Sequence, residues 1–316
     1  MLSVIIPSRS PEFLQKTVDE CLTKAKNDVE VIVVLDGIPD PGLKPDPRLK
    51  VFSHGTLREN LGMRETINLG VKNSIGDHIM KIDEHCMLDQ DYDEKLLADC
   101  EDNWIVIPRR YRLAWESWSI LEDGRRPVDY MFLAYPFERS HDKACGLHGA
   151  EWKERYDTRL DILIDETMSW QGSCYYMSRK HWDWMGPMET SKYGPFTQEA
   201  QELGNKTWLG GGKIMVNKKT WYAHYHKGSR GKRYGFTNWQ YKLHGDQMEL
   251  GREFCVDYWL SNAWEGRIHD FKWLVDRFSP VPTWPPDWEE RIHKDKLLDY
   301  RFVRPDGPIN PNILTI

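Results

Sequence analysis

The stretch His78-Ile-Met-Lys-Ile-Asp-Glu-His85 joins a short, mostly apolar run to three polar side chains that can do chemistry. The first five residues predict a β-strand, and Asp83, Glu84 and His85 follow at its carboxyl end. In open α/β sheets, ligands bind beyond the carboxyl ends of the strands. The stretch therefore predicts a sheet and also the edge of that sheet where a functional site belongs.

The residues before this stretch alternate between apolar runs and helical patterns, which is typical of βαβ units. Ser10 is placed to cap a helix whose first position is Pro11. Further strands are predicted at residues 4–6, 31–35 and 49–52, a helix at 61–74 and a loop at 38–47. We expect an α/β fold with a Rossmann-like, mainly parallel central sheet flanked by helices.

Asp83 and His85 are two residues apart, so in extended chain both side chains project to the same side and can bind one cation together. A carboxylate with an imidazole suits Mn²⁺, with Mg²⁺ as the alternative ion. The spacing alone also fits an Asx turn followed by a solvated histidine. Asp36, at the end of the strand at 31–35, is a second polar side chain on the same predicted edge.

Composition limits the classes of function. The chain has 316 residues and a net charge of -6, which argues against a generally basic nucleic-acid binder. The six cysteines are scattered without a Cys-x-x-Cys pair, so zinc and redox roles are not expected. Neither a signal peptide nor a membrane-spanning run is recognised, and we expect a cytoplasmic protein with no membrane partner. The 15 tryptophans suit a core and also suit stacking on sugar rings.

The second half of the chain is less regular. A strand is predicted at 104–107, an extended segment at 168–177, a helix at 197–207 and a strand at 213–216, and the order of 108–165 is left open. The last ninety residues mix tryptophan, tyrosine and phenylalanine with charges and are expected to be helical and loop-like. Core packing is the expected role of these aromatic residues.

Several short motifs resemble one family in order and spacing. They are Ser3-Val-Ile-Ile-Pro7, Val33-Val-Leu-Asp36-Gly, Asn60-Leu-Gly-Met-Arg64, Gly76-Asp77, Lys81-Ile-Asp-Glu-His-Cys86, Trp170-Gln-Gly-Ser-Cys, Gln198-Glu199-Ala-Gln-Glu202, Trp208-Leu-Gly-Gly-Gly212 and Ala223-His224. Together they resemble family 2-like glycosyltransferases of the GT-A fold. The Asp-x-His-Cys form is most similar to the polypeptide N-acetylgalactosaminyltransferases.

This resemblance covers residues 1–230 and implies a domain organisation. Residues 1–230 would be a GT-A catalytic domain, with a nucleotide-binding half at 1–100 and an acceptor half at 101–230. Residues 231–316 would be a helical and loop-like extension packed on it. The mucin-type enzymes carry a membrane anchor and a lectin domain whose motifs are not found here, so a mucin-type acceptor is not expected.

The resemblance also implies site residues. Asp36 would hold the uracil or ribose of a UDP-sugar donor, with Pro7 and Arg64 also at the donor. Asp83 and His85 would bind the metal, with His224 as the third ligand and His226 as its rival. The metal would act as a Lewis acid for the departing nucleotide diphosphate.

Glu199 is the predicted catalytic residue. It lies at the start of a helix, where the helix dipole favours an ionised carboxylate. The resemblance implies either a general base, as in inverting members, or a group that positions substrates, as in retaining ones, and the stereochemical outcome stays open. Gln198 and Trp170 would contact the acceptor. Glu202 is expected only to stabilise the first helical turn.

Two basic clusters remain. Lys227 and Arg230 belong to a glycine-containing basic loop, Lys227-Gly-Ser-Arg-Gly-Lys-Arg233, that would close over the donor diphosphate or touch an anionic acceptor, or would be merely solvated. Arg109, Arg110 and Arg112 form a second cluster with an acceptor surface as its one candidate role. The acceptor would be a hydroxyl on a glycan, a protein or a hydroxymethylated DNA base, so nucleic acid stays a candidate partner.

Two other functions remain open. One is a metal-dependent nucleotidyltransferase, although the residues after the first strand do not form the usual glycine- and lysine-rich phosphate loop. The other is a catalytically silent protein of the same fold that binds a sugar or nucleotide. Retention of Asp83, His85, Glu199 and His224 argues against the silent protein.

Overall fold

The computed structural model describes residues 1–56, 59–134, 147–194, 196–226 and 245–292. Within these residues, ten strands join in one sheet, and its central path runs β10-β12-β6-β11-β4-β1-β2-β3. The strands at one end are β1 (Leu2–Ser8), β2 (Val29–Asp36), β3 (Leu49–His54) and β4 (His78–Ile82), and these four run parallel to one another. This is the predicted parallel half of an α/β sheet.

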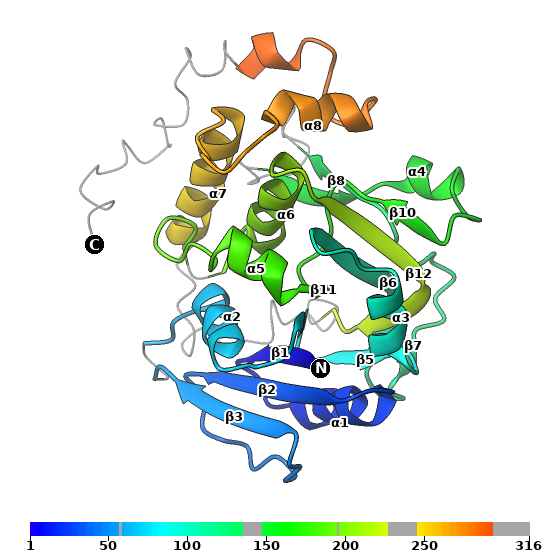
Figure 1. The fold of residues 1–316 in the computed structure, drawn as a ribbon, viewed down its shortest axis with the longest axis vertical. Helices are drawn as coiled ribbons and strands as arrows, with labels where there is room; N and C mark the ends of the chain where they lie inside the picture. Colours follow the sequence, from blue (N-terminus) through cyan, green and yellow to red (C-terminus); the bar gives the residue numbers. More distant parts are fainter. Residues whose placement is uncertain (57–58, 135–146, 195, 227–244, 293–316) are drawn as a thin grey trace.

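Successive apolar side chains of β1 and β2 point to opposite faces of the sheet, which explains why helices cover both faces of this half (Figure 1). Ile5 and Ile32 pack on one face against Ile67 of α2 (Met63–Lys72). Val4 and Val31 pack on the other face with the apolar side of α1 (Leu14–Lys24). A strand buried on both faces reads as a continuous apolar run, as these two do.

The first helix begins later than predicted. Ser10 does not cap it, because α1 begins at Leu14 and its N-terminal flanking residue, Phe13, makes no side-chain cap. The backbone N–H of Ser10 instead donates to the Glu84 carboxylate, with 3.0 Å between N and Oε2. The turn after β1 is therefore tied to the end of β4 before the helix starts.

The second half of the sheet is mixed. The strand β11 (Cys174–Ser178) runs antiparallel to both β4 and β6 (Trp104–Ala114), and β12 (Lys213–His224) runs parallel to β6. The remaining elements are β5 (Cys86–Leu88), α3 (Tyr92–Ala98), β7 (Ser119–Ile120), β8 (Met131–Ala134), β9 (His148–Glu151), α4 (Lys153–Asp157), β10 (Ile164–Glu166), α5 (Arg179–Met185) and α6 (Glu199–Leu209). The sequence had predicted parts of β6, β11, α6 and β12 but none of β7 to β10.

Helices α7 (Gly245–Leu260) and α8 (Phe271–Phe278) follow β12 and lie beside α6 (Figure 1). Trp259, Trp284 and Trp288 are buried in the same apolar cluster as Trp208 of α6. The described part of the aromatic C-terminal region thus contains two helices and contributes to the core. In the described part of the chain, no helix combines the length and apolar character that crossing a membrane requires.

Candidate active site

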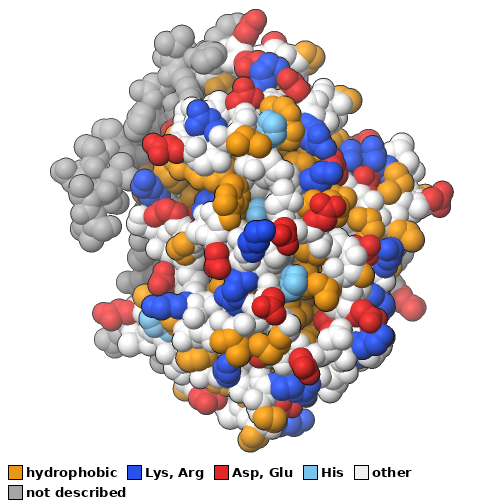
Figure 2. All heavy atoms as spheres, viewed as in Figure 1, with side chains coloured by type: hydrophobic (Ala, Val, Ile, Leu, Met, Phe, Trp, Pro, Cys, Tyr) orange, Lys and Arg blue, Asp and Glu red, His pale blue; other side chains and the backbone are white. Residues whose placement is uncertain are grey.

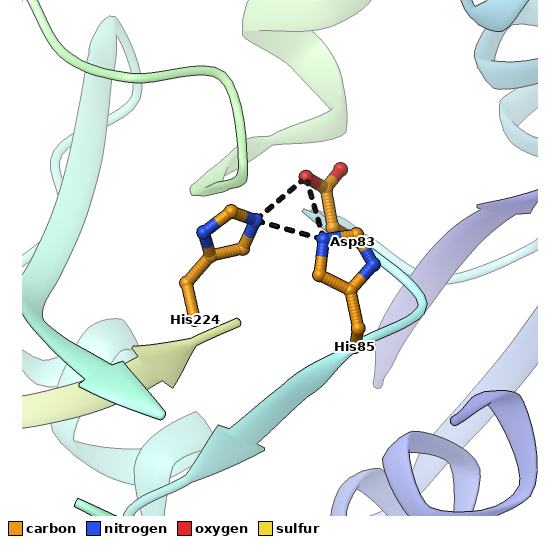
Figure 3. A group of neighbouring side chains, drawn as sticks. All are labelled: Asp83, His85 and His224. Atoms are coloured by element: carbon orange, nitrogen blue, oxygen red, sulfur yellow. Dashed lines mark hydrogen bonds and ion pairs between the residues drawn. The ribbon is translucent and has the colours of Figure 1, made fainter. Parts of the chain in front are cut away.

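A carboxylate and two imidazoles meet at the carboxyl edge of the sheet (Figure 3). Asp83 and His85 follow β4, and His224 ends β12. The antiparallel pairing of β12 with β5 sets His224 opposite Cys86, directly after His85. Nε2 of His224 lies 3.0 Å from Nε2 of His85 and 3.2 Å from Oδ2 of Asp83. The strand β12, distant in sequence from β4, thus adds a third side chain to the Asp83 and His85 pair that the spacing predicted.

The donor set fits a divalent transition metal. Ligand atoms of the three residues lie within 4.8 Å of one another, and both histidines are buried. Burial lowers the pKa of His224, although Asp83 opposes that shift, so the imidazole stays neutral and its lone pair is available. Among the described residues, no other cluster of acids, histidines or cysteines has this geometry.

His226 lies outside this group. Its Nε2 is 3.2 Å from a guanidinium nitrogen of Arg110, while its ring is edge-on to that of His224. Burial, helped by His224 and Arg110, lowers the pKa of His226 to about 3. The geometry therefore favours His224 over His226 as the third candidate ligand.

Lys81 fixes the orientation of Asp83. Its Nζ lies 2.6 Å from Oδ1 of Asp83 and donates to the carbonyl of Gly172 at the same distance. The lysine side chain is only 1% exposed. Burial acts to raise the pKa of the Asp83 carboxyl, but Lys81 and His224 outweigh it, and the pKa is well below its usual range. One oxygen thus binds Lys81, and the other faces the imidazoles.

Glu199 approaches the same lysine from α6. Its Oε1 lies 3.5 Å from Nζ of Lys81, and the residue is 4% exposed. Burial raises the pKa of Glu199, against the direction expected from its place at the helix N-terminus, because desolvation outweighs the effect of Lys81. A Cβ at Gly172 would lie 2.9 Å from Oε2 of Glu199, so only glycine leaves the carboxylate room. Gln198, directly before the helix, is buried with φ of 62°.

Asp36 is fully buried at the end of β2. Its carboxylate accepts hydrogen bonds from the backbone N–H groups of Leu61 and Gly62, at 2.8 and 3.0 Å. Nε of Arg9 lies 3.3 Å from Oδ2. Asp36 therefore joins the turns after β1 and β3, and its predicted contact with uracil or ribose stays a prediction. Pro7 is partly buried in β1, and its donor contact is likewise untested.

Arg64 is committed to other groups of the protein. It is fully buried, donates to the carbonyls of Glu189 and Thr197, both at 2.7 Å, and forms an ion pair with Glu202. The guanidinium also lies over the ring of Tyr193. These contacts connect α2 to α6 and describe a structural brace, whereas the predicted donor contact has no support from them.

Trp170 is 2% exposed and lies in the main core. A Cβ at Gly204 of α6 would meet its ring at 2.9 Å, and Tyr175 packs against it edge-on. The indole is used here in packing, and its acceptor contact stays a prediction. Lys227 and Arg230 lie outside the described residues.

The three arginines of β6 differ in their partners. Arg109 forms a bidentate pair with Asp129, and Arg112 pairs with Asp123. Arg110 contacts the amide oxygen of Gln171 and the ring of His226, and no ion pair of Arg110 is found among the described residues. Arg110 therefore brings towards the candidate metal group a positive charge that no described carboxylate contacts directly.

Sequence reasoning assigned no site role to Lys81 and no separate role to Glu84, and it named Arg110 only as part of a candidate acceptor surface. The available signal for Lys81 was a lysine inside an otherwise apolar strand, two residues before Asp83 and thus on the same side. Glu84 accepts hydrogen bonds from Ser8, Arg9 and Ser10, so it orders the turn next to Asp36. That role depends on contacts across more than seventy residues, which local patterns do not reveal.

The fold and site together define a class of α/β protein with a mixed carboxylate and imidazole group at the sheet edge. The family model described as glycosyl transferase family 2 matches residues 3–148. Residues 3–148 are thus similar in sequence to family 2 glycosyltransferases, and the fold is of the GT-A type, as the resemblance predicted.

Two curated relatives and one solved structure illustrate the similarity. Glycosyltransferase GlyA of Streptococcus pneumoniae is 29% identical over 30% of this chain and 14% of its own length. The uncharacterized glycosyltransferase EpsJ of Bacillus subtilis is 27% identical over 34% of this chain and 32% of its own. A structure of GalNAc-T7 with UDP, GalNAc and Mn²⁺ is 15% identical, with a TM-score of 0.65 over 83% of this chain and 49% of that one. The matched regions thus cover less than half of each relative.

Proposed function

We propose that this chain is a metal-dependent glycosyltransferase that takes a sugar from a UDP-sugar donor and transfers it to a hydroxyl group. The group of Asp83, His85 and His224 is the observation that supports this most directly. It lies where α/β sheets bind nucleotides, and its donor atoms suit Mn²⁺. GalNAc-T7, which shares the fold, was solved with UDP and Mn²⁺.

The charged groups around the candidate metal site have different tasks in this reaction. A bound divalent ion supplies Lewis-acid stabilisation to the departing diphosphate. Asp83 presents Oδ2 to that ion because Lys81 holds Oδ1. Arg110 supplies a second positive charge near the diphosphate, and Asp36 holds the nucleoside. These charges are fixed before the reaction, so little reorganisation is needed as negative charge develops.

Glu199 is the proposed catalytic residue on the acceptor side. Its raised pKa brings the carboxyl group nearer to neutral pH, where proton acceptance from a hydroxyl is most effective. Gln198 and Trp170 would line the acceptor position only if the segment before α6 or the core around Trp170 opens, because both residues are buried. Lys227 and Arg230 complete the proposal as donor-binding groups.

The acceptor is a hydroxyl of a glycan, a protein or a hydroxymethylated DNA base. Acidic and basic side chains are interspersed over the face drawn in Figure 2. Such a face does not offer the continuous basic surface by which proteins hold nucleic acid. Glycans and proteins therefore come before DNA in an acceptor screen.

Calorimetric titration of UDP into the protein, with and without Mn²⁺, tests the donor site. We expect Mn²⁺-dependent binding in the wild type and its loss in the double variant Asp83→Ala, His85→Ala. The matched control is Asp77→Ala, His78→Ala, an acid and an imidazole at the opposite end of the same strand. The donor assignment is wrong if UDP fails to bind the wild type or binds both double variants equally.

Product analysis separates this proposal from the nucleotidyltransferase alternative. With a UDP-sugar and Mn²⁺, glycosyl transfer to water or an acceptor releases UDP. A nucleotidyltransferase instead releases pyrophosphate from a nucleoside triphosphate, and a silent binding protein releases neither.

A further inference from the structure

Lys81 is an unusual neighbour for a metal ligand. It is a buried cation that lies 2.6 Å from the one carboxylate of the candidate metal group. The other two members, His85 and His224, are imidazoles, which bind metals in their neutral form. The charge of Lys81 offsets that of Asp83, which is the one carboxylate among the three candidate ligands. The nearest further acids are Glu199, 3.5 Å from Nζ of Lys81, and Glu84, 4.0 Å from Nδ1 of His85.

The position of Lys81 is fixed on several sides. Its Nζ also donates to the carbonyl of Gly172 at 2.6 Å and lies 3.9 Å from the sulfur of Met63. Glu199 is the other nearby acid, at 3.5 Å from the same nitrogen. Asp83 is thus the nearest charged partner of Lys81, and the lysine cannot move away without leaving two partly buried hydrogen-bond acceptors unpaired.

Arg110 adds to the same imbalance. Its described polar partners, Gln171 and His226, are an amide and an imidazole. A divalent cation that enters the candidate metal group therefore meets two positive charges, Lys81 and Arg110. Lys81 pairs directly with a carboxylate, whereas Arg110 does not. A diphosphate would relieve this repulsion, because its oxygens carry several negative charges and can bind the metal and face the arginine.

We propose that Lys81 makes metal binding depend on the diphosphate: it holds the affinity of the free protein for Mn²⁺ low and thereby couples the metal to the nucleotide. This inference rests on the proposed function and adds an order of assembly to it. Lys81 acts here as a positioning and charge-balancing residue, and it contacts neither substrate nor metal. By linkage, the metal raises the affinity for UDP by the same factor by which UDP raises that for Mn²⁺.

The test measures Mn²⁺ binding by electron paramagnetic resonance of the free ion, with and without saturating UDP. In the wild type, we expect UDP to raise the Mn²⁺ affinity by about tenfold or more, the usual range of coupling between two ligands. In Lys81→Gln, we expect the affinity without UDP to rise by about tenfold, because a positive charge a few ångströms from the metal is removed. The coupling to UDP should shrink accordingly.

The direction of this change separates charge balance from a structural role. If Lys81 had only a structural role, replacing it would lower the Mn²⁺ affinity both with and without UDP. Glutamine keeps a hydrogen-bond donor for Asp83, and Lys81→Arg, which keeps the charge, should retain the wild-type coupling. Lys218→Gln is the matched control, since Lys218 is also a buried lysine, with Asp129 at 3.9 Å, and stands outside the metal group. Circular dichroism checks that each variant is folded.

A second probe keeps this inference distinct from the donor proposal. Inorganic pyrophosphate carries the diphosphate charge without a base or sugar. If UDP does not bind the wild type but pyrophosphate still raises Mn²⁺ affinity, the UDP-sugar assignment fails and the role of Lys81 stands. If neither anion changes Mn²⁺ affinity in the wild type, or if Lys81→Gln weakens Mn²⁺ binding, the inference is wrong.

Discussion

Two buried acids three residues apart on α6, Glu199 and Glu202, have very different surroundings. Glu202 forms ion pairs with Arg64 and Lys206 and accepts a hydrogen bond from the backbone N–H of Glu189. The nearest cation to Glu199 is Lys81, at 3.5 Å, and that lysine lies closer to Asp83. The first acid is fully balanced by the protein, and the second is not.

The difference indicates what each acid does. A buried carboxylate held between two cations suits a brace between α2 and α6. A buried carboxylate with a shared cation has a raised pKa and can take a proton during a reaction. Neutral substitution should therefore damage folding at Glu202 and catalysis at Glu199.

The largest expected effect is on stability, from Glu202→Gln. This change leaves the buried guanidinium of Arg64 without its carboxylate, and breaking a buried pair on one side costs about 3–5 kcal/mol. Urea unfolding followed by circular dichroism measures it. The exposed Glu101→Gln is the control and should change the free energy of unfolding by less than about 0.5 kcal/mol. If Glu202→Gln lowered the free energy of unfolding by less than about 1 kcal/mol, Glu202 would not be a structural brace between α2 and α6, and the contrast with Glu199 would be weaker.

Acid should destabilise the contact between α5 and α6. His181 is buried, lies 2.9 Å from the Thr207 hydroxyl, and has a pKa lowered by burial to about 4 from 6.5. The folded protein keeps this imidazole neutral while the unfolded chain protonates it, so stability is complete above pH 6.5 and is lost as the pH falls towards 4. The shift corresponds to about 3 kcal/mol.

Unfolding free energies measured across this pH range should therefore fall more steeply in the wild type than in His181→Gln. Glutamine can still contact Thr207 but does not titrate. Parallel pH profiles for the two proteins would show that the imidazole is not held neutral.

Glu199→Gln should show the opposite pattern, with lost activity and kept stability. We expect donor hydrolysis with Mn²⁺ to fall by about 100-fold, as for loss of a general acid or base. The free energy of unfolding should stay within about 1 kcal/mol of the wild type, because an amide avoids the cost of burying a charge. Normal turnover together with a stability loss like that of Glu202→Gln would place Glu199 among the structural acids.

The features that the sequence predicted correctly are those that depend on neighbouring residues. The strands and helices of residues 2–82 were predictable because apolar periodicity and turn residues act locally. The Asp83 and His85 pair was predictable for the same reason, as two residues on one side of extended chain. The Ser10 cap was a wrong prediction because Glu84, more than seventy residues away, takes the backbone N–H of Ser10.

The rest depends on contacts between distant segments. Glu199 and Glu202 look alike in the sequence, and only Arg64 and Lys206 around one of them and Lys81 near the other distinguish the two. His224 came from a family resemblance, since the antiparallel pairing of β12 with β5 that brings it to His85 has no local signature. The short strands between β6 and β11 lack the length that makes a period recognisable.

The smallest expected effect distinguishes the two histidines at the end of β12. Nε2 of His224 faces Asp83 and His85, whereas Nε2 of His226 faces Arg110. His226→Asn should therefore change Mn²⁺ affinity by less than about threefold, while His224→Asn should lower it by about tenfold or more, as expected for loss of a ligand. Electron paramagnetic resonance with UDP present measures both. If His226→Asn lowered Mn²⁺ affinity more than His224→Asn did, His226 would be the ligand and the metal would lie nearer to Arg110. The positive charge of Arg110 would then weaken metal binding, and the proposed balance between Lys81 and the diphosphate would no longer apply.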